Sequence, residues 1–230
     1  MSFVRDLFRL FFPATCCCCD TLLVGGEHSV CTKCLLSLPT TQFADIPDNS
    51  AEQRFLGRIP IQAATSLLYF NHHNITRPLI HSIKYQGNVE LAHTMGRQMG
   101  IEFNRTRRFD DVDILVPIPL HRRKQRKRGY NQAQEICIGI AEVFPRPISM
   151  GDLVRIVNTK TQTHKNRRQR MDNMENVFEV RHPEALQNKH LLVVDDVMTS
   201  GATIEAACRP LLDIPGVSIS IATLAMAGDF

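Results

Sequence analysis

The stretch HLLVVDDVMTSGAT, residues 190–203, constrains the fold of this chain more than any other segment. It begins as a continuous apolar run, typical of a strand buried on both faces, and ends in two carboxylates and a turn of small residues. A helical pattern, TIEAACRPLL, follows directly. Strand, turn and helix in this order predict one unit of a parallel sheet, with polar residues at the carboxyl end of its strand.

Further strands and helices alternate along the chain. The predicted strands are residues 64–70, 112–119, 153–157, 177–180, 190–195 and 217–227. The predicted helices are two within 76–103, separated at Gly87, one that Asn131 caps and that continues to 141, and one at 203–212. Residues 35–60, with three prolines, are expected to form a connecting stretch. The expected fold is an α/β domain with a mostly parallel sheet flanked by helices.

The turn after the strand at 190–195 has the chemistry of a phosphate site. A helix that begins there leaves its first backbone N–H groups without intrahelical partners, at the positive end of the helix dipole. Thr199, Ser200 and Thr203 add hydroxyl donors, while Gly201, without a Cβ, lets a phosphate approach the backbone closely.

Two acidic residues, Asp195 and Asp196, stand before this turn. A phosphate in contact with them would be repelled, so their partners must be hydrogen-bond donors or a cation. The adjacent hydroxyls of a ribose fit that demand, and so does Mg²⁺ nearby. A pair of helix-capping acids followed by an ordinary turn is the alternative. The segment as a whole favours a phosphosugar site.

Six of the eight cysteines lie between positions 16 and 34. Cys16 and Cys19 form one C-x-x-C pair and Cys31 and Cys34 form the second, with eleven residues between the pairs. In a reducing compartment, clustered thiols bind metal more often than they form disulfides. Four thiolates at this spacing predict a tetrahedral zinc site. Because no position is left for water, the zinc would support the fold and would not catalyse.

The four consecutive cysteines leave the register of the first pair open, because Cys17 or Cys18 could replace one of its ligands. Spacing favours Cys16 with Cys19. The alternatives to zinc are a redox pair or a set of buried thiols. His28 is a weaker candidate ligand.

The formal net charge is only +4, but its distribution is uneven. Residues 121–128 contain six Lys or Arg, residues 160–170 contain five, and neither run contains Asp or Glu. Both runs are expected in loops, and they predict either an anionic partner or a solvated surface. Tyr130 is the only aromatic residue beside the first run, so binding of single-stranded nucleic acid by stacking is weakly indicated, while binding through charge stays open. His121 and His164 are candidates for proton transfer.

The first twelve residues, MSFVRDLFRLFF, are apolar but are interrupted by Arg5, Asp6 and Arg9. This pattern matches neither the apolar core of a signal peptide nor a membrane span. It predicts an amphipathic helix packed on the protein itself, with a helix lying on a membrane as the alternative. A cytoplasmic protein without a membrane span is expected.

Residues 195–203 resemble the binding signature for phosphoribosyl diphosphate (PRPP) in type I phosphoribosyltransferases. The whole chain resembles the competence protein F (ComF) family, from residue 13 to about residue 227. The segments that carry this likeness are, in order, the paired C-x-x-C, LIHSIKYQGN (79–88), LVPIPLHRRKQRKRGYNQA (115–133) and TQTHKNRRQRMDN (161–173). One departure is Asp20, where this family commonly has glycine after the second cysteine.

The resemblance implies a type I phosphoribosyltransferase-like domain at 60–230 and an N-terminal helix with a four-cysteine zinc module at 1–40. It implies that Asp195 and Asp196 bind the ribose of PRPP and act as the catalytic pair. The residues implied to hold the 5-phosphate are Thr199, Ser200, Gly201, Ala202 and Thr203. The residues implied to receive the diphosphate, together with Mg²⁺, are Arg122, Arg123, Arg126 and Arg128.

For function, the resemblance implies a PRPP-binding protein of natural transformation and DNA uptake that displaces diphosphate from PRPP. The segment KTQTHKNRRQR (160–170) resembles a mobile loop that closes over the site. One alternative is a non-catalytic adaptor that binds PRPP or single-stranded DNA and works with other DNA-uptake proteins. The other is a nucleobase salvage phosphoribosyltransferase. No general base for an acceptor stands out in the sequence.

Overall fold

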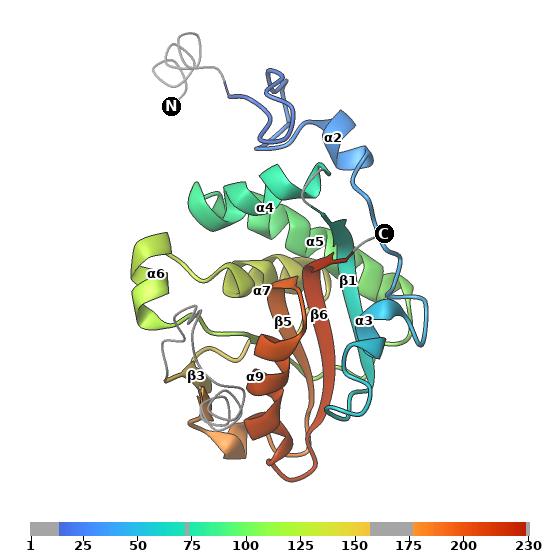
Figure 1. The fold of residues 1–230 in the computed structure, drawn as a ribbon, viewed down its shortest axis with the longest axis vertical. Helices are drawn as coiled ribbons and strands as arrows, with labels where there is room; N and C mark the ends of the chain where they lie inside the picture. Colours follow the sequence, from blue (N-terminus) through green and yellow to red (C-terminus); the bar gives the residue numbers. More distant parts are fainter. Residues whose placement is uncertain (1–13, 72–73, 157–176, 229–230) are drawn as a thin grey trace, which may run out of the picture.

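A four-stranded parallel sheet forms the centre of the molecule (Figure 1). The computed structural model describes residues 14–71, 74–156 and 177–228, and the order of the sheet is β1-β6-β5-β2. Its strands are β1 (Ala63–Phe70), β2 (Ile114–Pro117), β5 (His190–Met198) and β6 (Ser218–Ala227). A separate antiparallel pair joins β3 (Leu153–Arg155) to β4 (Phe178–Val180). Each strand overlaps a predicted one, and the expected α/β fold is confirmed.

The central strand β5 is covered on both faces. Residues 191–194 have no exposed surface, as a continuous apolar run predicts for such a strand. Because all four strands of the sheet are parallel, their carboxyl ends lie at one edge. Asp195 lies beside Thr223 of β6 in the register of the sheet. The acid pair and the turn after it are therefore at the edge where open α/β sheets bind ligands.

Helices cover both faces of the sheet (Figure 1). The helices are α2 (Thr32–Leu36), α3 (Ser50–Gln53), α4 (Thr76–Tyr85), α5 (Val89–Arg105), α6 (Arg122–Arg128), α7 (Gln132–Val143), α9 (Ala202–Leu212) and the short 3-10 helix η1 (Pro183–Ala185). One apolar core joins the sheet to α4, α5 and α7, and a second joins the sheet to α3, α9 and β4. The predicted cap of α7 is confirmed, because Asn131 accepts a hydrogen bond from the Ala133 N–H at 3.2 Å.

The first basic run is a helix, so the prediction of a loop at 121–128 is wrong. No residue of α6 is buried, and a helix without a buried face leaves no apolar periodicity in the sequence. Arg, Lys and Gln nonetheless have high helix propensity. His121 caps the helix by accepting from the Arg123 N–H at 3.2 Å. Gly129, with φ of +86°, ends it in the left-handed conformation.

The connecting stretch at 35–60 belongs to the core. Phe43, Ala51, Phe55 and Ile59 are all buried in the second core, together with α9. Asn49 caps α3 and donates to the Ala64 carbonyl of β1 at 2.9 Å. This stretch is thereby fixed against the sheet, close to the end of β5.

The cysteine segment contacts the rest of the chain next to α4 (Figure 1). Cys16, Cys31 and Cys34 belong to the same apolar core as α4 and α5. Ser29 Oγ donates to Asn88 Oδ1 at 2.8 Å, which ties the segment to the N-terminus of α5. These contacts hold the cysteine segment against the sheet domain.

Two predictions are not tested by the structure. The division into a module at 1–40 and a domain at 60–230 stays a prediction. The helix expected at residues 1–12 lies outside the described residues. Among the helices that are described, none combines the length and the apolar character needed to cross a membrane.

Candidate functional site

The predicted phosphate turn connects β5 to α9. Thr199, Ser200 and Thr203 are exposed, and α9 begins at Ala202 without a side-chain cap for its first turn. Gly201 has φ of +77°, and a Cβ there would lie 3.0 Å from the ring of Phe55. Only glycine fits such a position without strain. The Ala202 N–H donates to Ser200 Oγ at 3.4 Å, and the turn offers its exposed hydroxyls and the remaining backbone amides to an anion.

The two carboxylates before the turn point to different sides of β5. Side chains alternate along a strand, and the contacts agree with that geometry. Asp196 Oδ1 lies 3.0 Å from Lys84 Nζ, on the side of α4. Asp195 Oδ1 accepts a hydrogen bond from the Asp196 backbone N–H at 2.8 Å. Asp195 also lies near Arg155: burial lowers the pKa of Arg155, and the negative charge of Asp195 raises it by a smaller amount. The pair thus spans the edge of the sheet.

Asp195 gives the stability of the protein a dependence on pH. Burial, with the charge of Asp196 as the second cause, raises the pKa of Asp195 from 3.8 to about 7. A carboxyl whose pKa is raised by folding stabilises the folded state below pH 3.8, and this contribution is lost as the pH rises through about 7. We expect Asp195→Asn to raise the unfolding temperature at pH 8 by on the order of 3 °C, with no change at pH 3.5. Calorimetric scans at the two pH values, without ligand, check this, and a lower unfolding temperature at pH 8 would contradict it.

Cations from three elements surround the acid pair. Lys84 comes from the last turn of α4, Lys124 from α6 and Arg155 from the end of β3. Burial first, and then the charges of Arg155, Arg128 and Lys84, lower the pKa of Lys124, while the charge of Asp196 raises it. This crowding of positive charge is the arrangement that attracts a polyanion such as diphosphate.

The four arginines assigned to diphosphate do not share one environment. Arg122, Arg123 and Arg126 are exposed on α6. Arg128 instead donates to Gln132 Oε1 at 2.8 Å, and its guanidinium lies 5.4 Å from the centre of the Tyr85 ring. Their role in binding diphosphate stays a prediction.

The structure describes only one of the two histidines that were candidates for proton transfer, His121. His121 uses its Nδ1 as the cap of α6, and its pKa is lowered by burial and then by the charges of Arg123 and Arg155. While Nδ1 accepts this hydrogen bond, a neutral His121 carries its proton on Nε2, so it can donate a proton there but can accept one only at Nδ1, by breaking the cap. His164, like the rest of the second basic run, lies outside the described residues.

A pocket of about 670 Å³ lies between α6 and β3. Its wall includes Pro117 at the end of β2, Pro119 just after it, Gln125 of α6 and Arg155 of β3. Because Arg155 also interacts with Asp195, the pocket adjoins the acid pair. Its volume suits a small molecule.

The two C-x-x-C pairs come together at one centre. The Sγ atoms of Cys16, Cys19, Cys31 and Cys34 all lie within 4.8 Å of one another, and those of Cys19 and Cys31 are 3.7 Å apart. Four sulfurs bound tetrahedrally to one Zn²⁺, with Zn–S bonds of about 2.3 Å, are separated by about the distance seen between Cys19 Sγ and Cys31 Sγ. The Cys31 N–H points at Cys16 Sγ at 3.3 Å, as a donor to a thiolate would. The donor set fits a structural Zn²⁺.

The alternative ligands lie apart from this centre. The Cys18 thiol faces the Ile75 carbonyl at 3.9 Å, and Cys17 Sγ is 3.6 Å from Cys18 Sγ. His28 is exposed and is not part of the group. Asp20 adopts φ of +58°, so the turn that glycine would favour forms here with aspartate. The geometry favours Cys16 with Cys19 as the first pair.

Sequence reasoning missed four cations of this site. The sequence indicated Lys84 only weakly, because this residue directly follows the buried Ile83 in the amphipathic helix α4. Arg155 gave none beyond its place in a short strand. Arg54 and Arg58, from the segment that follows α3, donate to the carbonyls of Thr199 and Ser200. Contacts across more than 140 residues leave no pattern in the sequence.

Comparison with known proteins agrees with this geometry. A family model described as "Phosphoribosyl transferase domain" matches residues 137–229. The chain is 30% identical over 138 residues to the DNA utilization protein YhgH of Escherichia coli (strain K12), covering 59% of this chain and 60% of that protein. It is 28% identical over 145 residues to the competence protein ComFC of Bacillus subtilis (strain 168), covering 63% of this chain and 56% of that protein. The matches thus span about three fifths of the length of these curated relatives.

Among solved structures, the glutamine PRPP amidotransferase from B. subtilis has a TM-score of 0.41 and 14% identity, over 62% of this chain and 30% of that one. The fold is that of the type I phosphoribosyltransferases, given the family match, the parallel sheet and the turn at the end of β5. Among proteins with this fold, two findings point to a smaller group: the four-cysteine cluster near the N-terminus and the likeness to YhgH and ComFC. The chain is thus similar to the ComF family of phosphoribosyltransferase-like proteins.

Proposed function

We propose that this protein binds PRPP and transfers its phosphoribosyl group to an acceptor with release of diphosphate. The observation that carries the proposal is the exposed turn at 199–203, which follows an acid pair at the carboxyl end of β5 and opens helix α9. A sugar phosphate needs donors for its phosphate and acceptors for its hydroxyls. This edge of the sheet supplies both within nine residues, 195–203.

The 5-phosphate binds at the turn. The N–H groups of the first turn of α9 and the hydroxyls of Thr199, Ser200 and Thr203 donate to its oxygens. The ribose then lies over the end of β5, where its 2- and 3-hydroxyls donate to Asp195 and Asp196. A carboxylate accepts such bonds more strongly than a neutral oxygen does, so binding of the ribose hydroxyls favours the ionised form of Asp195.

The diphosphate lies toward α6 and β3. Lys84, Lys124 and Arg155 provide positive charge there, and the pocket of about 670 Å³ provides room. Mg²⁺ usually binds through substrate phosphates and one or two carboxylates, so it would be held together with the diphosphate. When bound, Mg²⁺ neutralises charge on the departing diphosphate. The chain's cations add to that stabilisation, which is greatest when the charge has fully developed.

In the reaction, the bond between ribose C1 and the diphosphate oxygen breaks, and the bond electrons leave with diphosphate. A bond then forms between C1 and the acceptor, whose proton passes to solvent or to a base. With water as acceptor the product is ribose 5-phosphate. The acid pair orients the ribose by its hydroxyls, and so holds C1 in line between the diphosphate and the acceptor.

Diphosphate release tests this proposal against the non-catalytic adaptor. The protein is incubated with PRPP and Mg²⁺, alone and with a panel of nucleobases and other nucleophiles, after calorimetry has measured PRPP binding. The proposal expects PRPP binding and at least one acceptor that speeds diphosphate release. Binding with no release in any mixture would favour the adaptor, and a response confined to nucleobases would favour salvage. No binding of PRPP would overturn the proposal.

A second candidate function is binding of single-stranded DNA through the exposed cations of α6. Arg122, Arg123, Arg126 and Lys127 are exposed, and six of the seven residues of this helix are basic. One relative is named a DNA utilization protein and another a competence protein. From these names we extend to this chain a role in competence and the use of DNA, and we propose that it acts in the cytoplasm. The affinity for a single-stranded oligonucleotide should fall steeply with salt, by about tenfold between 50 and 200 mM for two phosphate contacts, and a flat response would remove this candidate.

A further inference from the structure

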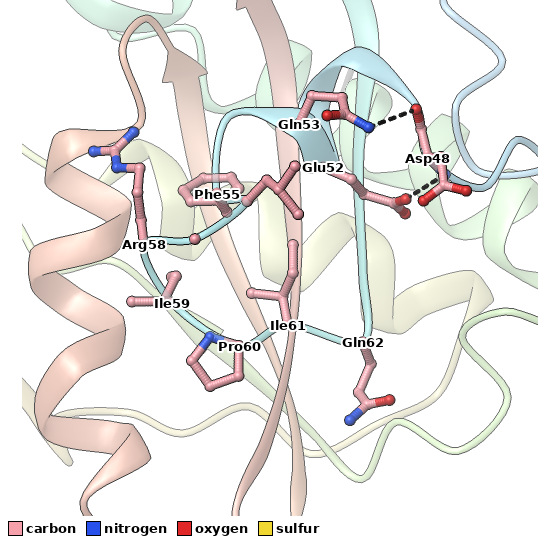
Figure 2. Close-up of a pocket in the computed structure, with 11 residues that line it drawn as sticks. Asp48, Glu52, Gln53, Phe55, Arg58, Ile59, Pro60, Ile61 and Gln62 are labelled. Atoms are coloured by element: carbon pink, nitrogen blue, oxygen red, sulfur yellow. Dashed lines mark hydrogen bonds between the residues drawn. The ribbon is translucent and has the colours of Figure 1, made fainter.

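Two arginines hold the outer side of the phosphate turn. They come from the segment 48–62, which surrounds a pocket of about 540 Å³ (Figure 2). Arg54 Nη1 donates to the Thr199 carbonyl, and Arg58 Nη1 donates to the Ser200 carbonyl at 2.9 Å. Figure 2 shows Arg58 beside the first turn of α9. Two successive carbonyls of the turn are thus fixed by side chains from a distant part of the chain.

These hydrogen bonds determine where the amides of the turn point. In a trans peptide the C=O of one residue and the N–H of the next point in opposite directions. With the Thr199 carbonyl held by Arg54, the Ser200 N–H points away from Arg54. With the Ser200 carbonyl held by Arg58, the Gly201 N–H points away from Arg58 in the same manner. Both amides therefore point to the side of the turn opposite the two arginines.

The same arginines connect the turn to the rest of the sheet edge. The second nitrogen of Arg54, Nη2, donates to the Ala227 carbonyl at the end of β6. Arg58 Nη1 also donates to the Arg54 carbonyl at 2.8 Å, so the two residues support each other. The ring of Phe55, between them in sequence, packs against Gly201. This segment is therefore a support for the turn and not only a surface loop.

Arg58 has a second effect, through charge. Glu205 lies in the first turn of α9, where its carboxylate would repel a phosphate bound at the turn. Arg58 Nη2 pairs with Glu205 Oε2, and Arg209 pairs with Glu205 Oε1. The pKa of Glu205 is lowered by these partners in opposition to burial, so the carboxylate is an anion whose charge the two guanidinium groups offset.

We infer that Arg54 and Arg58 are positioning residues for the 5-phosphate: they orient the amides of the turn through its carbonyls and do not contact the ligand. This inference rests on the proposed function, since it concerns the same turn. It adds residues that no pattern in the sequence pointed to, and it makes the segment after α3 a support of the binding site.

The test compares ligands that use the turn with one that does not. Calorimetry measures the affinity of PRPP with Mg²⁺, ribose 5-phosphate and inorganic diphosphate for the full chain and for Arg54→Met and Arg58→Met. Each variant should weaken PRPP and ribose 5-phosphate by about tenfold, the value of one charge-assisted hydrogen bond, and leave diphosphate unchanged. Arg105→Met is the control, because Arg105 pairs on the surface with Asp45 at 3.1 Å, and it should leave all three affinities unchanged.

A further variant separates orientation from charge. In the Arg58→Met background, Glu205→Gln removes the repelling carboxylate, and recovery of less than the full affinity for ribose 5-phosphate supports a role in orientation. Full recovery would reduce Arg58 to a counter-charge and overturn that role.

The remaining outcomes tell the two proposals apart. Equal loss for all three ligands, or unchanged affinities in both arginine variants, would overturn the inference while the proposed function stands. If the unchanged chain binds neither PRPP nor ribose 5-phosphate, the proposed function falls and this inference falls with it.

Discussion

Replacing Asp195 and Asp196 together by asparagine is expected to lower the affinity for PRPP by at least about a hundredfold, because each residue loses charge-assisted hydrogen bonds worth about 1.5–3 kcal/mol. The fold should persist. Asparagine has the shape of aspartate, and at Asp195 it removes a carboxylate whose ionisation burial opposes. Lower affinity with undiminished stability is the combination expected of a binding site, where function is maintained at a cost in stability. Calorimetric titration with PRPP and Mg²⁺, together with thermal unfolding at pH 8, measures both quantities.

The matched control for this change is Asp213→Asn. Asp213 is exposed at the C-terminal end of α9, the end opposite the phosphate turn. Its replacement should leave the affinity for PRPP unchanged. If the doubly substituted chain bound PRPP as the original does, the acid pair would not hold the ribose. If it failed to fold, Asp195→Asn alone would carry the test.

Replacing Cys31 by serine is expected to reduce the zinc content well below one ion per chain and to destabilise the N-terminal part of the protein. Four thiolates at this spacing form a closed site, and a missing ligand removes a large part of a binding energy of about 10–16 kcal/mol that is coupled to folding. Zinc content by elemental analysis and thermal unfolding should fall together. Removal of zinc from the original chain by a chelator should lower the unfolding temperature in the same direction.

Cys18→Ser is the control that tests the register of the first pair. Its thiol faces the Ile75 carbonyl, outside the group of four sulfurs, so zinc content should stay near one per chain. Loss of zinc in Cys18→Ser would show that the first pair had been assigned wrongly. Retention of a full complement of zinc in Cys31→Ser would remove Cys31 from the ligand set.

Local patterns in the sequence are enough to predict the strands of the sheet and the edge at which the acid pair and the turn lie. β5 contains a continuous apolar run at 191–194, as expected of a strand covered on both faces, and β6 is mostly apolar, with serine and threonine at only three of its ten positions. The acid pair and the turn follow β5 directly, so their place at the edge follows from chain order alone. The cysteine cluster is predictable for the same reason, since its ligands lie within 19 residues of sequence, 16–34.

The features that sequence patterns do not predict depend on contacts between distant segments or on elements without a buried face. Helix α6 exposes every side chain apart from those near its end, so its sequence shows charge and no periodicity. Lys84 reaches Asp196 across more than 110 residues, and Arg54 reaches Thr199 across 145. Such pairs form only after the sheet has assembled.

The most direct test of this account is a crystal structure of the full chain with PRPP and Mg²⁺. We expect the 5-phosphate on the amides of residues 200–203, the ribose hydroxyls on Asp195 and Asp196, and the diphosphate toward Lys84 and Arg155. Ligand density with the 5-phosphate anywhere other than the turn between β5 and α9 would contradict this expectation.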